Sequence, residues 1–187
     1  MAIGRVLLHT ADNPGYAFAC LPTIFSWRRW GWGVHVGLRV GNEAVELRMR
    51  QEYERAGACV YRVSPDAPAP MHPLSWTMLS RYYAAQEDAA LYGGIVILGD
   101  ADLLRTEPLD WPVPDGDPLV TVGRNLWNGT EWEPRWPTCH IGGTAAAWAQ
   151  LRYTVADIEA VRRADGWLDD EVLFRHYQLT HPEIRRP

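Results

Sequence analysis

Apolar residues along the first hundred positions follow two patterns that alternate with each other. Short runs rich in β-branched residues are typical of strands, and longer stretches between them have apolar spacings that fit helices. Strands are expected at residues 5–9, 34–40, 58–63 and 94–99. Helices are expected at residues 16–27, 44–55 and 74–90. Strands that alternate with helices predict an α/β fold with a mostly parallel sheet.

The pattern changes after residue 106, where a Pro-rich stretch precedes a short strand expected at residues 119–123. A polar loop with three tryptophans follows, and flat apolar rings of this kind suit the face of a sugar. A pair of glycines then precedes a helix that we expect to begin at about Thr144, and a last helix is expected near Asp169. The tryptophans of the loop are Trp127, Trp132 and Trp136.

The strand expected at residues 94–99 leads directly into two aspartates, Asp100 and Asp102. Side chains alternate along an extended chain, so both carboxylates point the same way if the extended backbone continues. Two carboxylates on one side repel each other unless water or a cation separates them. A turn with a helix cap would also use Asp. Ligands in α/β sheets bind beyond the carboxyl ends of strands, which favours a functional role.

The composition of the chain excludes several classes of function. The chain has 187 residues and a formal net charge of −5, which argues against a nucleic-acid surface. All 18 basic residues are arginine, so any mechanism that needs lysine is excluded. Cys20, Cys59 and Cys139 lack metal-site spacing and indicate reduced thiols. No stretch has the ~20 apolar residues of a membrane span, and the first residues lack a signal-peptide core, so we expect a cytoplasmic protein.

A strand that ends in Asp-x-Asp is compatible with three chemistries. A haloacid-dehalogenase-type phosphatase and a sugar-nucleotide pyrophosphorylase both need a lysine, which the chain lacks. The third is a glycosyltransferase in which the aspartates hold Mn²⁺ or Mg²⁺, and the ion neutralises the diphosphate of a nucleotide-sugar. An added imidazole would favour Mn²⁺. His140 is the candidate for this ligand, with a purely structural histidine as the alternative.

The span from Leu74 to Leu104, LSWTMLSRYYAAQEDAALYGGIVILGDADLL, resembles the helix, strand and DxD segment of GT-A-fold glycosyltransferases. The resemblance implies a GT-A-like, Rossmann-type sheet flanked by helices in one compact domain, residues 1–187. Residues 1–106 would form a nucleotide-binding lobe that ends in the DxD motif, and residues 107–187 an acceptor and catalytic lobe.

The same resemblance assigns residues to the nucleotide. It implies that Arg81 on the preceding helix faces the nucleotide, although a solvent-exposed helix charge is an equal alternative. The loop after the first strand would hold the nucleoside base, and Tyr16 could stack on it or simply be a core or surface residue. The expected nucleotide contacts from these segments are Thr10, Ala11, Tyr16, Arg81, Asp100, Ala101 and Asp102.

The C-terminal segments CHIGGTAAAW and GWLDDEVLFRHY are similar to the GGT and W-x-D-E segments of the retaining α1,3-galactosyltransferase and ABO blood-group family. The resemblance implies that His140 and the GGT segment line the donor-sugar and acceptor site, and that Asp170 and Glu171 reach the reacting carbon. An additional acid, Asp169, leaves open which acid matches which, and helix capping also explains the cluster. The GGT residues are Gly142, Gly143 and Thr144.

Together these observations predict a metal-dependent glycosyltransferase that uses a nucleoside-diphosphate sugar, with a UDP-sugar favoured, and that retains the anomeric configuration. The acceptor is an unidentified saccharide or other hydroxyl compound, and neither nucleic acid nor a membrane span is expected. Two alternatives stay open. One is a metal-dependent hydrolase of nucleotide-sugars or phosphoesters, and the other is a non-catalytic carbohydrate- or nucleotide-binding module.

Overall fold

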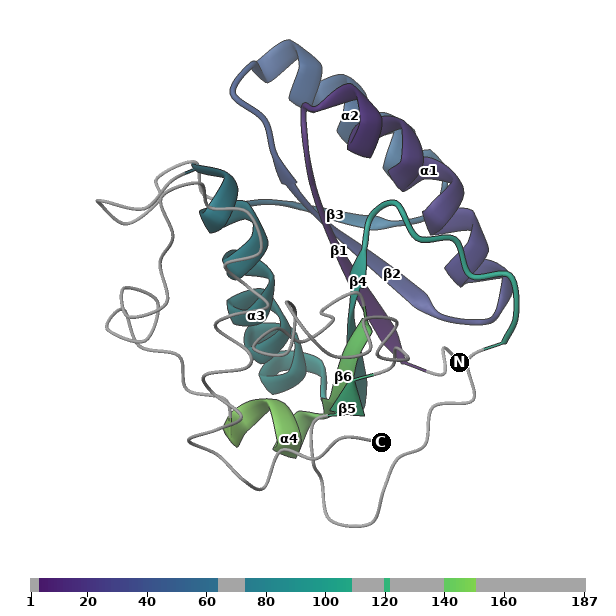
Figure 1. Cartoon of the computed structure of the whole chain (residues 1–187), viewed down its shortest axis with the longest axis vertical. Coiled ribbons are helices and arrows are strands. Elements are labelled where there is room, and N and C mark those ends of the chain that lie inside the picture. Colours follow the sequence, from purple (N-terminus) through teal and green to yellow (C-terminus); the bar gives the residue numbers. More distant parts are fainter. Residues whose placement is uncertain (1–3, 64–72, 109–119, 122–139, 151–187) are drawn as a thin grey trace, which may run out of the picture.

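A six-stranded sheet with helices on both faces organises the chain in the computed structural model (Figure 1). The structure describes residues 4–63, 73–108, 120–121 and 140–150. The strands are β1 (Arg5–Ala11), β2 (Gly33–Arg39), β3 (Cys59–Arg62), β4 (Ile95–Asp100), β5 (Val120–Thr121) and β6 (His140–Thr144). The helices are α1 (Pro14–Arg29), α2 (Glu43–Arg55), α3 (Pro73–Tyr92) and α4 (Ala145–Gln150).

The elements expected before residue 106 are all present, with ends that differ by no more than two residues. The strand expected at 119–123 is present as β5, and the helix expected near Thr144 begins at Ala145. The glycine pair differs from expectation, because it lies inside β6 rather than at the opening of the helix. The helix expected near Asp169 lies outside the described residues.

The sheet order is β3-β2-β1-β4-β6-β5. The first four of these strands are parallel, and β6 reverses direction beside β4 and pairs on its other side with β5. The carboxyl ends of the four parallel strands therefore meet at one edge of the sheet, and β6 begins at this edge with His140. This edge is called the carboxyl edge below. The expected α/β fold with its mostly parallel sheet is confirmed.

Two hydrophobic layers cover the faces of the sheet. Along β1, Val6 and Leu8 face α1 and α2, whereas Leu7 faces α3, as the alternation of a strand requires. Trp27 of α1 and Trp148 of α4 are completely buried in opposite layers. Burying an apolar side chain of this size stabilises the fold by roughly 1.5–3 kcal/mol. Trp148 also donates its indole N–H to the carbonyl of Val96, 2.9 Å away.

Asparagine caps fix the starts of α1 and α2 at the carboxyl edge. The side chain of Asn13 accepts a hydrogen bond from the Gly15 N–H at 3.0 Å, and Asn42 accepts from the N–H groups of Ala44 and Val45 at 3.0 and 3.2 Å. Each cap satisfies N–H groups that have no partner within the helix. The first turn of α1 consequently lies beside the carboxyl edge. Among the described helices, none is long and apolar enough to cross a membrane.

Candidate functional site

Acidic and basic side chains meet at the carboxyl edge, where β4 ends. His9 of β1 is paired in register with Asp100 of β4, and Gly99 is paired with His140 of β6. Because paired residues lie on the same face, His9 and Asp100 both face α3, as Leu7 and Leu98 do before them. Helix α3 supplies the groups that bind this row of side chains.

Arg81 of α3 and Asp100 form an ion pair, with 2.8 Å between Nη1 and Oδ1. The side chain of Arg81 is 3% exposed and that of Asp100 is 30% exposed. A buried guanidinium needs a partner of opposite charge, and this carboxylate provides one. The alternative of a solvent-exposed helix charge at Arg81 is therefore wrong. Asp100 is held with one oxygen against α3 while part of its side chain remains open to solvent.

The second aspartate lies beyond the strand rather than along it. Strand β4 ends at Asp100, and the next two residues form a turn closed by the Leu103 N–H, which donates to the carbonyl of Asp100 at 3.4 Å. The extended backbone therefore does not continue to Asp102. Ala101 is 3% exposed and belongs to the layer beneath α1 and α2, so its methyl group is part of the core.

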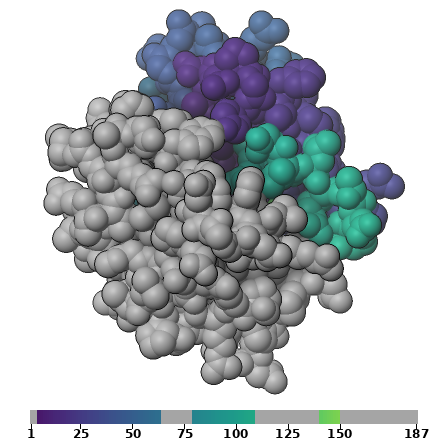
Figure 2. Space-filling view, viewed as in Figure 1, coloured from purple at the N-terminus to yellow at the C-terminus, as the bar shows by residue number. Residues whose placement is uncertain are grey.

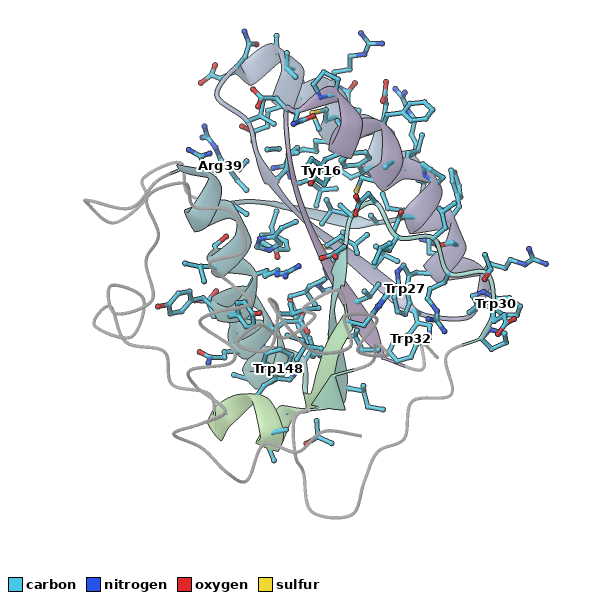
Figure 3. All side chains as sticks on the ribbon, in the orientation of Figure 1. Tyr16, Trp27, Trp30, Trp32, Arg39 and Trp148 are labelled. Carbon is cyan, nitrogen blue, oxygen red and sulfur yellow. The ribbon has the colours of Figure 1, made fainter. Side chains whose placement is uncertain are left out.

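Electrostatic effects still join Asp102 to its neighbours at the edge. Partial burial, followed by the negative charge of Asp100, raises the pKa of the Asp102 carboxyl. Burial, followed by the charges of Asp102 and Asp100, raises the pKa of the Tyr16 hydroxyl in the first turn of α1. The charges of Asp100 and Asp102 thus act on Tyr16, which the sequence predicts to contact the nucleotide. Figure 3 places Tyr16 at the upper part of the sheet, toward which β1 and β4 run.

The segment after Asp102 returns along α1 toward the C-terminal end of that helix. The Arg105 N–H donates to Ser26 Oγ at 3.0 Å, and the Trp30 indole N–H points at the Arg105 carbonyl at 3.4 Å. In the space-filling view this teal segment lies against the purple surface of α1 (Figure 2). The guanidinium of Arg105 lies over the ring of Trp27, with Cζ 5.7 Å from the centroid.

His140 lies next to Asp100 in the sheet, but its ring is on the opposite face. Its ring centroid is 5.5 Å from that of Trp27, a residue of α1. Burial lowers the pKa of the imidazole to about 4, with the charge of Asp100 acting in the other direction and those of Arg105 and Arg81 adding to the decrease. The ring is therefore neutral at pH 7. Within the described residues its Nε2 is buried without a hydrogen-bond partner.

The chemistry of the two aspartates fits a divalent cation that is bound together with a substrate. Mg²⁺ is typically held by one or two carboxylates, with substrate phosphates and water completing its shell. Asp100 and Asp102 offer hard oxygen ligands of this kind. Within the described ranges, no three His, Cys, Asp or Glu side chains come close enough together to hold a metal ion on their own.

The GGT segment is directed away from this edge, because β6 is antiparallel to β4. Gly142 and Gly143 are buried in the sheet, where Gly142 is paired with Ile97 of β4 and Val120 of β5. Thr144 is paired with Ile95, the first residue of β4. Five residues of strand, about 17 Å, separate that position from Asp100. Thr144 instead accepts a hydrogen bond from the Ala147 N–H at 3.2 Å. The three GGT residues, expected to line the donor-sugar and acceptor site, are not brought together with the aspartates.

The end of β1 lies at the carboxyl edge, as expected. Its last two residues, Thr10 and Ala11, lie on opposite faces of the sheet. Thr10 is 2% exposed and shares the face of Val6 and Leu8, so its hydroxyl lies in the layer beneath α1 and α2. Ala11 is half-buried and on the α3 face. Several expected site residues lie outside the described residues, namely Asp169, Asp170, Glu171, Trp127, Trp132 and Trp136.

Sequence analysis did not identify a second set of polar residues beneath the edge. His9 Nε2 is 2.5 Å from the hydroxyl of Tyr61 on β3, and His9 Nδ1 is 3.2 Å from Ser80 Oγ on α3. Gly37 of β2 makes room for this contact, since a Cβ there would lie 2.5 Å from the imidazole. A histidine in a strand followed by a serine in a distant helix gives no local pattern by which the contact could be found.

Comparisons with known proteins identify solved structures that are similar in fold. No protein-family model and no curated protein matches the chain. It is similar in structure to a putative nucleotide-diphospho-sugar transferase from Desulfovibrio desulfuricans G20, with a TM-score of 0.59, 11% identity, and 100% of this chain and 80% of that chain covered. It is also similar to an active-site mutant of LgtC, with a TM-score of 0.61, 16% identity, and 92% and 70% covered. The chain thus has the GT-A-like fold implied by its sequence.

Proposed function

We propose that the chain is a glycosyltransferase that takes a nucleoside-diphosphate sugar, preferably a UDP-sugar, and transfers the sugar to a hydroxyl acceptor with retention of configuration. The observation that carries the proposal is the pair of acids at the end of β4, with Asp100 held by the buried Arg81 in a GT-A-like fold. The similar transferase from Desulfovibrio desulfuricans G20 supports the choice of a nucleotide-sugar as donor.

The arrangement suits the charge that develops on the leaving group. Cleavage of the sugar–phosphate bond leaves a nucleoside diphosphate with additional negative charge. Asp100 and Asp102 would hold Mn²⁺ or Mg²⁺, and a divalent ion at this position supplies the charge that stabilises the diphosphate. The ion pair with Arg81 fixes the orientation of Asp100, so the carboxylate does not have to reorganise when the substrate binds.

Other residues at the edge would complete the site. The hydroxyl of Tyr16, which the charges of Asp102 and Asp100 influence, would donate a hydrogen bond to the bound nucleotide. The ring of His140 is neutral, which is the form in which a histidine binds a metal, but it is buried against Trp27 on the face of the sheet opposite Asp100. The proposed ion therefore depends on the two aspartates. Asp170 or Glu171 would face the anomeric carbon, and the tryptophan-containing loop would shape the sugar site.

The test is a titration of UDP into the protein with Mn²⁺ and, separately, with EDTA. We expect measurable affinity only with the metal, because the acids otherwise repel the phosphates. Asp102→Asn should abolish metal-dependent binding, whereas Glu54→Gln, which removes one negative charge from the exposed side of α2, should leave it unchanged. Equal affinity with and without metal would contradict the role given to the two aspartates.

Turnover then separates transfer from hydrolysis. Incubation with UDP-sugars and a panel of saccharide acceptors should release UDP at a rate that depends on the acceptor, with a new glycoside in the products. Acceptor-independent release of free sugar would support the hydrolase, and binding without any turnover would support the binding module. Proton NMR of the fresh product should show an α linkage from an α-linked donor if the configuration is retained.

A further inference from the structure

Arg39 is a charged residue at the carboxyl edge to which no role has been assigned above. It is the last residue of β2 and is paired in register with Ala11, the last residue of β1 (Figure 3). Its side chain is half-buried. In the described part of the chain its Nε is shielded from solvent and has no hydrogen-bond partner, and no carboxylate lies within ion-pair distance of it.

The alternation of β2 places Arg39 on the same face as the aspartate site. His35 of β2 reaches Asp88 of α3, with 2.7 Å between Nδ1 and Oδ2, and Gly37 lies against His9. Arg39 follows two residues later on this face, one step nearer to the edge. Because β1 lies between β2 and β4, Arg39 is two strand spacings, about 10 Å, along the edge from the end of β4.

The buried Nε of Arg39 has no acceptor within the described residues, so an acceptor on a bound ligand would satisfy it. The group carries five N–H donors in a planar fork and has no acceptor atom. Burying such donors without a partner forfeits their hydrogen bonds to water. Ala11, which is paired with Arg39 and lies between it and the end of β4, has only a methyl side chain. Arg39 is thus suited to bind a ligand that presents a carbonyl or similar oxygen.

We propose that Arg39 reads the base of the donor nucleotide by donating hydrogen bonds to a carbonyl oxygen on the outer edge of the base. This inference rests on the proposed function, since a diphosphate bound at Asp100 and Asp102 directs the nucleoside along the edge toward β2. Uracil presents the O4 acceptor at the position where cytosine carries an amino donor, and guanine presents O6 where adenine carries an amino group. Arg39 would therefore select uracil and guanine and reject cytosine and adenine.

A phosphate is a less suitable partner for Arg39 on this geometry. The diphosphate must approach the acids at the end of β4, and Arg39 is separated from them by a whole strand. Arg81 is the cation on the aspartate side, and it is already bound to Asp100. The two arginines would accordingly serve opposite ends of one nucleotide, with Arg81 at the phosphates and Arg39 at the base.

Calorimetry with four nucleotides tests this assignment. UDP, CDP, GDP and ADP are titrated, with Mn²⁺ present, into the wild-type protein and into Arg39→Gln, Arg39→Lys and Arg48→Gln. Arg48 is a matched control on α2, because its side chain is 82% exposed and pairs only with a neighbouring glutamate among the described residues. Circular dichroism and melting temperature establish that each variant is folded.

We expect the wild-type protein to bind UDP at least about tenfold more tightly than CDP, and GDP more tightly than ADP, since a good arginine–base contact discriminates by this amount. Arg39→Gln should lose this preference, because it should weaken the binding of UDP and GDP and leave the binding of CDP and ADP unchanged. Arg39→Lys should keep part of the preference, and Arg48→Gln should match the wild type. A uniform loss for all four nucleotides, or an unchanged preference in Arg39→Gln, would overturn the assignment and leave the proposed function standing. If no nucleoside diphosphate binds the wild-type protein, the proposed function fails, and this inference fails with it.

Discussion

Ser80 and Arg81, adjacent residues of α3, bind the paired positions His9 of β1 and Asp100 of β4. Arg81 contacts Asp100 at 2.8 Å and Ser80 contacts His9 at 3.2 Å. Since His9 and Asp100 are neighbours on one face of the sheet, a single turn of helix fixes the ends of two strands. The position of the first aspartate is thereby set by the fold before any ligand binds.

The Arg81–Asp100 pair should respond unequally to removal of either partner. Asp100→Ala leaves a guanidinium that is 3% exposed without its carboxylate, whereas Arg81→Met leaves a carboxylate that is 30% exposed and can be hydrated. Removing one partner of a buried pair costs on the order of 3–5 kcal/mol. We expect Asp100→Ala to approach this value and Arg81→Met to cost less. Urea denaturation at pH 7 measures both, and equal losses would contradict the unequal burial.

His140 should give the protein a stability loss in mild acid. Burial lowers its pKa to about 4 in the folded state, below the ordinary value of 6.5. The unfolded chain therefore binds more protons in this window, so the free energy of unfolding is highest above pH 6.5 and falls as the pH decreases toward 4. The integrated loss is on the order of 3 kcal/mol. Denaturation curves of His140→Gln should show a much flatter dependence between these pH values. An identical slope in the variant would exclude His140 as the source.

Asp88 should affect the free energy of unfolding in a separate pH range, below that of His140. Burial raises the pKa of this carboxyl, but hydrogen bonds and charge from His35 and Arg5 outweigh burial, and the net shift is downward from 3.8. A lowered folded-state pKa stabilises the protein above the ordinary value, and this contribution is lost as the pH falls below 3.8. Asp88→Asn should remove the loss of stability below pH 3.8 and preserve the loss between pH 6.5 and 4 that His140 causes. Disappearance of both losses in one variant would mean that the two sites are coupled.

Gly37 and Gly41 provide a matched pair for testing the polar row beneath the edge. A Cβ at Gly37 would lie 2.5 Å from the His9 ring and 3.0 Å from Tyr61 Cζ, whereas nothing lies within 4 Å of a Cβ at Gly41. Gly37→Ala should displace His9 and cost roughly 1–3 kcal/mol, as overpacking in a core does. Gly41→Ala should be nearly neutral. Thermal denaturation measures the stability of both variants. An equal loss of stability in the two would exclude crowding at His9 as the cause.

The acids expected to act at the anomeric carbon can be separated from helix caps. Asp170→Asn and Glu171→Gln should cut turnover of a UDP-sugar by orders of magnitude with little change in UDP affinity, if the residue acts mainly on the transition state. A cap would instead contribute about 0.5–2 kcal/mol to stability and nothing to turnover. Single-turnover rates together with melting temperatures distinguish the two. Earlier melting with full turnover would remove the catalytic assignment.

Local patterns in the sequence determined the first part of the fold. The apolar strand before Asp100 and the alternating elements ahead of it depend on neighbouring residues, so the apolar period suffices to locate them. The sequence also showed that two acids follow a buried strand, and the alternation of strands with helices implied that they lie at a ligand-binding edge.

Tertiary structure decided what depends on distant partners. The glycines of HIGGT have low strand propensity and were expected to open a helix, but pairing with β4 and β5 on both sides makes them a strand that runs away from the edge. The turn after Asp100 replaces the extended backbone that alternation alone would continue. The contacts of His9 with Tyr61 and Ser80, and the position of Arg39 beside Ala11, join residues far apart in the chain. Strand register and the placement of α3 on the sheet produce these contacts, and neither is encoded in any short stretch of sequence.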